Sequence, residues 1–436
     1  MKPQTTLLLP YIALVVVLAG TLSLLVVLAV PAGALSGDQV LQAAILGLMI
    51  AGARNFPIHL SPASKIFVDT AAIFAAILLL PAPWALATAG GGILVGEAMR
   101  RGHPLQFVFG VAETVVEVAA AAMIYYLLQA DGVGSGTAAE INLLAIGLAA
   151  VAVYALNVVL VDTIIALTIG FGSLRWSVSR HRVDLPQQVA LYFLGLFAAL
   201  TAYHYPLTLA FLAIPASVVY ISLRDGQFLR RGAQETLESL ADIVDLRDHY
   251  TFEHSTRVAN LARAVAGEMK LNPDQIEAVY TGARIHDVGK IGIKGEVLLK
   301  EGPLSDDDWR EMKTHPELGA TLVSKFPDYI SAAQYVLAHH ERFDGRGYPN
   351  KLKGKDIPLG ARIISVADCF DAMTSKRPYR SALDIAVTIA EIRRNAGKQF
   401  DPECVAALIN VLNRQGLLPA SEQSLAVPML QPELAT

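Results

Sequence analysis

Eight stretches in the first half of the chain are almost entirely apolar and are separated by short polar segments. The first, residues 6–30, has no charged residue and exceeds the about 20 apolar residues that a helix needs to cross a bilayer. The other runs are 40–53, 66–80, 84–99, 107–129, 141–170, 188–202 and 207–223. Several are short, and residues 66–99 can form one hairpin or one helix broken around Pro81 and Pro83. The pattern predicts a helical membrane domain of about eight spans over residues 1–223.

Basic residues occur only in alternate loops of this domain. With eight spans and a cytoplasmic N-terminus, four loops face outward, and none of them contains Lys or Arg. These loops are 31–39, 81–83, 130–140 and 203–206. The positive-inside rule therefore predicts a multi-pass protein with both termini in the cytoplasm. A cleavable signal peptide over residues 1–34 is the competing interpretation, but the apolar run is too long for a normal signal-peptide core.

A few polar residues lie inside the predicted spans. Glu113 and Glu117 are four residues apart and share one helix face. Asn157 and Asp162 lie within another apolar run. Carboxylates are costly in a membrane and point to function. Two interpretations stay open: a ligand or ion site, and hydrogen bonds or retained protons that serve helix packing.

Charge is divided unevenly along the chain. Overall, 53% of the residues are hydrophobic and 17% are charged, against roughly 45–50% and 25% in soluble domains. Residues 1–223 hold only 8 of the 35 basic and 9 of the 39 acidic residues. Neither half is basic enough to predict a nucleic-acid polymer as partner. The two cysteines, Cys369 and Cys404, do not suggest a disulfide framework.

Residues 224–248 connect the two halves. Their apolar positions have helical spacing, and most of the other positions are charged. The pattern predicts a helix that leaves the membrane and packs against a partner or its own domain. Two arrangements stay open: a homodimer through this connector helix, and an ordinary first helix of the cytoplasmic domain.

The second half contains six of the ten histidines, and carboxylates accompany them. The histidines are His249, His254, His286, His315, His339 and His340. Imidazole and carboxylate ligands suit iron, manganese and zinc. The adjacent pair His286 and Asp287 allows a carboxylate to bridge two ions, and two close metals can activate water against a phosphodiester. Because no cysteine ligands accompany the histidines, a structural zinc module is the poorer explanation.

The order of these motifs resembles a known family. The stretches are HSTRV, ARIHDVGKIGI, LLKEGPLSDDDWREMKTHPELG, HHERFDGRGYPNKLKGKDIPLGARIISVADCFDAMTSKRPYR and GKQFDPECV. Residues 235–415 resemble the HD-GYP subgroup of HD-superfamily phosphohydrolases, which degrade cyclic di-GMP. The name-giving motifs are His286-Asp287 and Gly347-Tyr348-Pro349. The predicted fold class is all-α: a polytopic helical membrane domain, then a cytoplasmic all-helical HD-GYP domain, in a bacterial inner membrane.

The resemblance implies a set of metal ligands by position, in which Asp287 is the bridging carboxylate. The implied ligands are His254, His286, Asp287, His315, His339, His340 and Asp368. It implies two divalent ions, iron or manganese rather than zinc or magnesium. Some members carry a Glu where this chain has Tyr250, and that Glu helps bind a third metal. We therefore expect two metals here, and the strength of the His340 ligand stays open.

Further roles are implied around the ligands. Asp287 and Lys290 are the expected catalytic residues, and the lysine resembles one that contacts the scissile phosphate. In the family, Tyr348 lies near the substrate, and Arg377 and Arg380 would hold phosphates, which suits bidentate Arg. Asp371 is expected to orient a ligand.

The resulting hypothesis is a membrane-bound, metal-dependent phosphodiesterase. It would hydrolyse cyclic di-GMP to pGpG under the control of its membrane domain, and a second cut to GMP stays open. One alternative is a receptor or scaffold that binds a cyclic dinucleotide or partner proteins without turnover. Another is a transporter that the cytoplasmic half gates. Residues 416–436 contain three Pro and little charge and are predicted to be a flexible tail.

Overall fold

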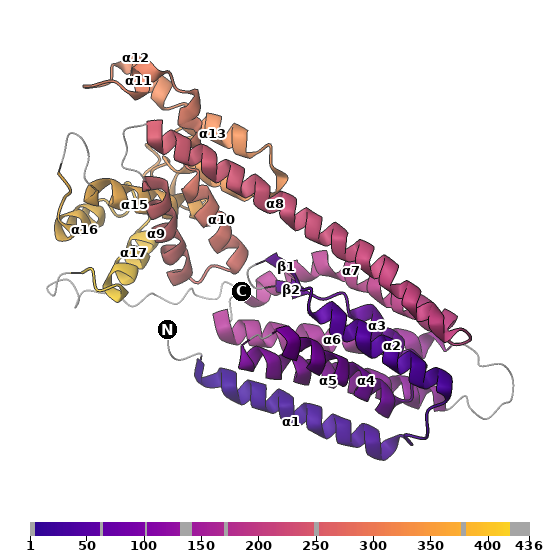
Figure 1. Ribbon diagram of the computed structural model, residues 1–436. Helices are drawn as coiled ribbons and strands as arrows, with labels where there is room; N and C mark the ends of the chain where they lie inside the picture. The colour runs from indigo at the N-terminus through magenta and orange to yellow at the C-terminus, as the bar shows by residue number, and fades with distance from the viewer. Residues whose placement is uncertain are drawn as a thin grey trace. The chain divides into compact units, whose positions relative to one another are not determined.

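The computed structural model divides the chain into two compact units, Met1–Gln227 and Phe228–Thr436. Both units are helical, and the described part of the chain contains one short β-hairpin besides (Figure 1). The all-α fold class is therefore confirmed. The residues that the structure describes are 5–61, 64–100, 103–130, 142–169, 173–247, 253–375 and 381–418. The predicted flexible tail lies outside these residues from position 419 onward.

The apolar runs of the first half form helices. The elements are α1 (Thr5–Ala29), α2 (Gly37–Arg54), α3 (Thr70–Leu79), α4 (Ala82–Arg100), α5 (Pro104–Ala130), α6 (Leu143–Ile169), α7 (Ser173–Ala202), η1 (Pro206–Leu212) and α8 (Ala213–Arg247). Among the described residues, five stretches are long and apolar enough to cross a membrane. They are Leu7–Ala29, Pro104–Gln129, Leu143–Thr168, Leu185–Ala202 and Pro206–Arg247. The eight-span count and the orientation stay predictions.

Residues 66–99 form two helices, α3 and α4, which meet at the Pro81–Pro83 segment. With 10 residues, α3 is only about 15 Å long, which is half of a ~30 Å hydrocarbon core. Seven consecutive residues of α3 are buried. A Cβ at Gly195 of α7 would lie 2.6 Å from the Ala71 carbonyl oxygen, so this glycine lets the two backbones approach closely. Helix α3 is thus a short, enclosed element of the first unit.

The hairpin lies between α2 and α3, where the apolar pattern predicts only an inner loop. Strand β1 (Ile58–Ser61) pairs with β2 (Ser64–Ile66) in antiparallel register, with Ile58 opposite Ile66. The pairing is irregular between His59 and Ser61. A segment this short gives no clear alternation of polar and apolar residues, which is why the pattern does not reveal it.

The second unit follows along the chain from α8. Its elements are α9 (His254–Glu268), α10 (Pro273–Arg284), η2 (Val288–Gly292), α11 (Gly295–Leu298), α12 (Asp306–Met312), α13 (His315–Val323), η3 (Pro327–Tyr329), α14 (Ile330–Ala338), η4 (Gly354–Asp356), α15 (Leu359–Thr374), α16 (Ile385–Arg394) and α17 (Pro402–Arg414). The main core joins α9, α10, α15 and α17. Local sequence sets the helix starts: Asn272 caps α10 in a capping box with Gln275. Asp401 likewise caps α17 before Pro402.

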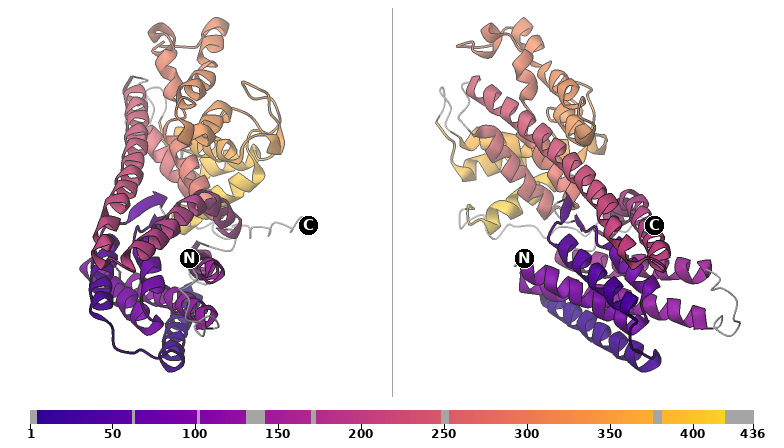
Figure 2. Two further views of the ribbon diagram at one scale, coloured as in Figure 1. Left: turned by 90° about the vertical axis from the view of Figure 1, so that its right-hand side faces the viewer. Right: turned by 45° about the vertical axis from the view of Figure 1, so that its right-hand side comes forward.

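Helix α8 is 35 residues long and can be followed as one continuous helix in each view (Figures 1 and 2). Its C-terminal part, which contains the connector, buries Leu237 and Ala241 against Ile285 and Val336 of its own domain. Large apolar side chains on other faces of this helix, such as Phe228, are exposed. The connector is therefore the first packed helix of the second unit.

Candidate metal centre

Helix ends bring most of the predicted ligands together. His254 and His315 are the first residues of α9 and α13. His286 and Asp287 lie between α10 and η2, and His339 immediately follows α14. Asp368 is the exception, because it projects from within α15. Side chains at helix ends can converge on one point without interrupting the packing of the helices around it.

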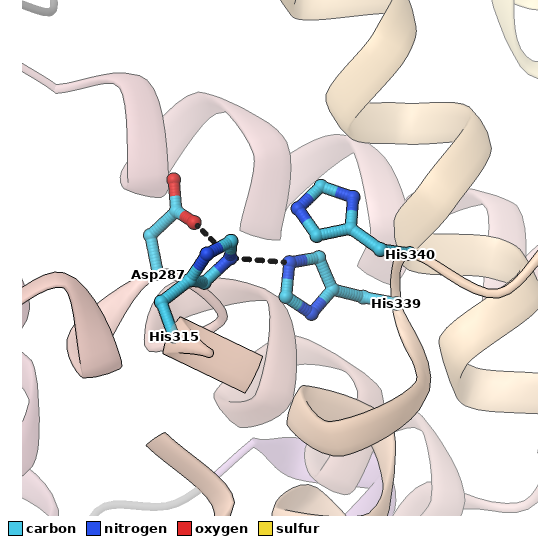
Figure 3. A group of neighbouring side chains, drawn as sticks. All are labelled: Asp287, His315, His339 and His340. Carbon is cyan, nitrogen blue, oxygen red and sulfur yellow. Dashed lines mark hydrogen bonds and ion pairs between the residues drawn. The ribbon is translucent and has the colours of Figure 1, made fainter. Parts of the chain in front are cut away.

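The first group consists of Asp287, His315, His339 and His340 (Figure 3). His315 Nε2 lies 3.2 Å from Asp287 Oδ1 and 3.4 Å from His339 Nε2. One nitrogen or oxygen atom of each residue lies within 4.8 Å of the corresponding atoms of the others. This spacing is suitable for a shared metal ion.

The second group consists of His254, His286 and Asp287. His286 Nε2 lies 3.4 Å from Asp287 Oδ2 and 4.0 Å from Asp368 Oδ1. His254 Nε2 lies 3.4 Å from the same Asp368 oxygen. Asp287 belongs to both groups, and its two oxygens face different histidines. The carboxylate is therefore placed to bridge two ions.

Backbone carbonyls fix the histidine rings. Three histidines each bond through Nδ1 to the carbonyl oxygen three residues earlier along the chain. The pairs are His286 with Ala283 at 2.7 Å, His315 with Met312 at 2.7 Å, and His339 with Val336 at 2.6 Å. A carbonyl can only accept, so Nδ1 carries the proton in each pair. The Nε2 lone pair is then directed into the centre, as metal ligation requires.

His254 is oriented by a carboxylate instead. Its Nδ1 lies 2.8 Å from Asp371 Oδ2, and Arg257 Nε donates to Asp371 Oδ1 at 2.7 Å. Burial lowers the pKa of His254, but its hydrogen bonds with Asp368 and Asp371 raise that pKa to about 10. In the metal-free protein His254 is therefore protonated at neutral pH, and a metal that binds Nε2 displaces a proton.

Three other ligand candidates, Asp287, His339 and His340, are held in the protonation states that metals need. Burial raises the pKa of Asp287, but the ammonium of Lys290 helps to hold that pKa well below its usual range. Burial and the neighbouring His340 hold the pKa of His339 well below its usual value. Burial and His315 lower the pKa of His340 to about 3. At neutral pH Asp287 is ionised and these two imidazoles are neutral.

One ring nitrogen tests whether a metal fits. His286 Nε2 is buried and forms no hydrogen bond with the described residues, and Asp287 Oδ2 is 3.4 Å away. A buried polar atom without a partner calls for a bound group. A metal ion would use this lone pair, and the nitrogen and oxygen donors around it suit divalent transition metals.

The predicted substrate residues are only partly described. Lys290 Nζ lies 2.8 Å from Asp287 Oδ2. The Tyr348 ring packs 4.9 Å from the His340 ring, between centroids. Arg377 and Arg380 lie outside the described residues, as does Tyr250.

The sequence analysis missed two residues that lie beside the loop of the Gly347-Tyr348-Pro349 motif. Lys313 Nζ lies 5.6 Å from the centre of the Tyr348 ring. Glu341 is buried, and its Oε1 accepts from the backbone N–H of Asn350 at 2.6 Å. The sequence does offer a signal for Glu341, because it directly follows two ligand candidates, His339 and His340. An acid that is buried at such a position needs a hydrogen-bond partner.

Gly289 sets the distance between η2 and α13. A Cβ at this position would lie 1.9 Å from the His315 carbonyl oxygen and 2.5 Å from Gly319 N. Only glycine therefore lets the Asp287 segment approach the first turn of α13. Gly347 plays the same part in its loop, where a Cβ would lie 2.3 Å from Arg342 N.

Comparison with known proteins identifies the domain that contains these residues. The family described as HD domain matches residues 238–404. Residues 238–404 form an HD domain. All seven ligand candidates lie within the matched segment.

Three curated relatives match the part of the chain that contains the HD domain. The cyclic di-GMP phosphodiesterase response regulator RpfG of Xanthomonas campestris is 41% identical over 178 residues, covering 40% of this chain and 47% of the relative. A cyclic di-GMP phosphodiesterase of Thermotoga maritima is 38% identical over 179 residues, covering 41% and 49%. The 3'3'-cGAMP-specific phosphodiesterase 3 of Vibrio cholerae is 37% identical over 177 residues, covering 41% and 38%. The chain spans less than half the length of these relatives.

Substitution of Gly289 tests the close packing beside Asp287. Gly289→Ala should destabilise the protein by roughly 1–3 kcal/mol, because the added methyl forces α13 away from η2. It should also lower the metal content, because His315 moves with α13. Thermal melting and metal analysis of the purified full-length protein measure both effects. Gly267→Ala is the matched control, because a Cβ there meets nothing within 4 Å. Unchanged metal content in Gly289→Ala would contradict the assignment.

Substitution of Asp287 tests the bridge. Asp287→Asn keeps the size of the side chain but removes its charge from both ligand groups. It should weaken Mn²⁺ binding by more than roughly 10–100-fold, which is the usual loss when a residue that only hydrogen-bonds a metal ligand is replaced. Equilibrium dialysis followed by metal analysis measures the affinity, and Asp356→Asn on the exposed η4 is the control. Loss of metal from only one group would show that Asp287 does not bridge.

Proposed function

We propose that this protein is a metal-dependent phosphodiesterase that opens cyclic di-GMP to pGpG and then cleaves pGpG to GMP. The observation that carries the proposal is the position of Asp287 in two ligand groups at once. The names of the relatives support the substrate class, since they include cyclic di-GMP and 3'3'-cGAMP phosphodiesterases.

Two divalent ions, iron or manganese, would be held by the two groups. Asp287 would be shared between them, and Asp368 would complete the second group. Such ions, when bound, would activate a water and neutralise charge on the phosphodiester. The ligand set has nitrogen and oxygen donors without sulfur, which supports these metals over structural zinc.

The chain's own groups would bind and orient the phosphodiester. Lys290 is buried with its ammonium beside the shared carboxylate, so it can bind a phosphate oxygen where negative charge develops. Tyr348 and Lys313 flank the histidine side of the centre. We assign Tyr348 to substrate contact, and Arg377 and Arg380 to the phosphates on the family resemblance alone.

The full-length protein in detergent, loaded with Mn²⁺ or anaerobically with Fe²⁺, should convert cyclic di-GMP to pGpG. Lys290→Ala should lower kcat by roughly 10²–10³-fold, as loss of a positioned charge-stabilising donor does. Chromatography of the products measures the rates, with 3'3'-cGAMP and pGpG as parallel substrates. Lys294→Ala is the control, because its ammonium is exposed and pairs with Glu311. If the metal-loaded protein binds cyclic dinucleotides tightly but cleaves none, the receptor function replaces the enzyme.

We further propose that the first unit regulates the site through α8. Arg284 donates to Asp242 of α8 at 2.5 Å, and it lies two residues before His286. Asp245 of α8 accepts from the backbone N–H of Ser255 at 3.0 Å and from its hydroxyl at 2.8 Å. Ser255 follows His254 directly. One helix therefore holds the backbone beside both histidines of the second ligand group.

Removal of the Asp245 carboxylate should separate α8 from the site. Asp245→Ala leaves a buried N–H and hydroxyl of Ser255 unpaired, which costs roughly 1–3 kcal/mol. We expect weaker metal binding at the His254 group and lower activity of the full-length protein. Glu235→Ala, on an exposed face of the same helix, should change neither. A lower melting temperature with unchanged metal affinity and activity would contradict coupling through this contact.

A further inference from the structure

A cavity of about 740 Å³ lies inside the first unit and is lined by residues of α1 to α7 and of the segment before α3. Small-molecule sites in proteins have volumes of about 300–1,000 Å³. The cavity is far larger than a metal ion requires, and its walls contain both apolar and charged side chains. It lies entirely within one unit and shares no residue with the metal centre.

Two arginines of the cavity wall already have carboxylate partners. Arg54 Nε lies 2.7 Å from Asp69 Oδ2, and an Nη atom of Arg100 lies 3.0 Å from Glu97 Oε1. The Arg54 guanidinium also stacks 4.2 Å from the centre of the Phe67 ring. These pairs balance two positive charges against two negative ones.

Two further carboxylates have no such balance. Glu113 and Glu117 lie one turn apart on α5 and are 8% and 6% exposed. Each accepts through Oε1 from the side-chain amide of Asn157 on α6 at 3.0 Å. No Lys, Arg or His of the described residues forms an ion pair with either carboxylate. The wall therefore carries two buried carboxylates without a basic partner, which is costly in a membrane unless they retain protons or a cation approaches.

The rest of the wall indicates what kind of cation fits. Phe109, Tyr154, Tyr192 and Ile164 line the same cavity. Aromatic faces attract organic cations, and aliphatic side chains accept an apolar body. We propose that this cavity binds a small organic cation, with an ammonium group against Glu113 and Glu117 and an apolar body against the aromatic wall. This site would supply the input that the first unit senses.

The predicted topology gives the side of entry. Arg54, Arg100 and His103 line the cavity and lie at or next to helix ends that the positive-inside pattern assigns to the cytoplasm. The ligand would enter from that side. The binding proposal itself depends on neither the orientation nor the phosphodiesterase activity.

Isothermal titration of the full-length protein in nanodiscs tests the proposal. The probes are phenethylammonium, hexylammonium and choline chlorides, with 2-phenylethanol as the neutral analogue and NaCl as the inorganic cation. At least one ammonium probe should bind and raise the melting temperature, whereas 2-phenylethanol and NaCl should do neither. Binding of none of the three, or equal binding of the neutral analogue or of Na⁺, overturns the proposal. Because no cyclic dinucleotide is present, this result is independent of the proposed enzyme activity.

Variants locate the site. The double variant Glu113→Gln/Glu117→Gln should lower the affinity for the ammonium probe at least ~10-fold, since loss of one partner of a buried charge pair is costly. Asp38→Asn, in the first turn of α2 and outside the cavity wall, should bind as the wild type does. If the double variant does not fold, Tyr154→Leu serves instead and should reduce the affinity for phenethylammonium more than for hexylammonium. Unchanged affinity in a folded double variant places the cation elsewhere and overturns the assignment.

Discussion

The candidate metal centre of the second unit depends on the carboxylate of Asp287, which belongs to both groups of ligand candidates. This carboxylate is buried, yet it stays ionised because Lys290 and the histidines around it favour the charged form. Its two oxygens serve two groups of ligands only because η2 lies against the first turn of α13. That approach requires Gly289, where no side chain fits. The bridge that we propose therefore depends on a single backbone position.

The positions of the histidines in turn depend on the helices around them. The carbonyls that fix three histidine rings belong to the last turn of α10, to the last residue of α12 and to the last turn of α14. A helix that frays at its end would therefore release a metal ligand. Helix α8 supports the same region through charged contacts beside His254 and His286. The long helix can influence the site because it contacts the segments that carry the ligands.

Much of this architecture follows from local sequence. Residue types and the family resemblance predict the ligand candidates, and the structure brings these histidines and acids together. Helical periodicity reveals α1, α5 and α6, whose apolar runs are long. Periodicity does not reveal that α3 is a buried helix. An apolar run of ten residues is compatible with both a buried helix and a buried strand. Periodicity also cannot pair Lys313 with Tyr348, or Glu341 with Asn350, because these contacts depend on how loops fold back in three dimensions.

Buried charge is handled in opposite ways in the two units. In the HD domain, Lys290 and the neighbouring histidines offset the charge of Asp287 and Asp368, and bound divalent cations would add to this balance. In the first unit, the arginines offset Asp69 and Glu97 but leave Glu113 and Glu117 with an amide. The sequence places both glutamates on one helix face, but only the fold brings Asn157 and the cavity beside them. An amide can donate hydrogen bonds but supplies no charge, so the balance there must come from protons or from a molecule that enters.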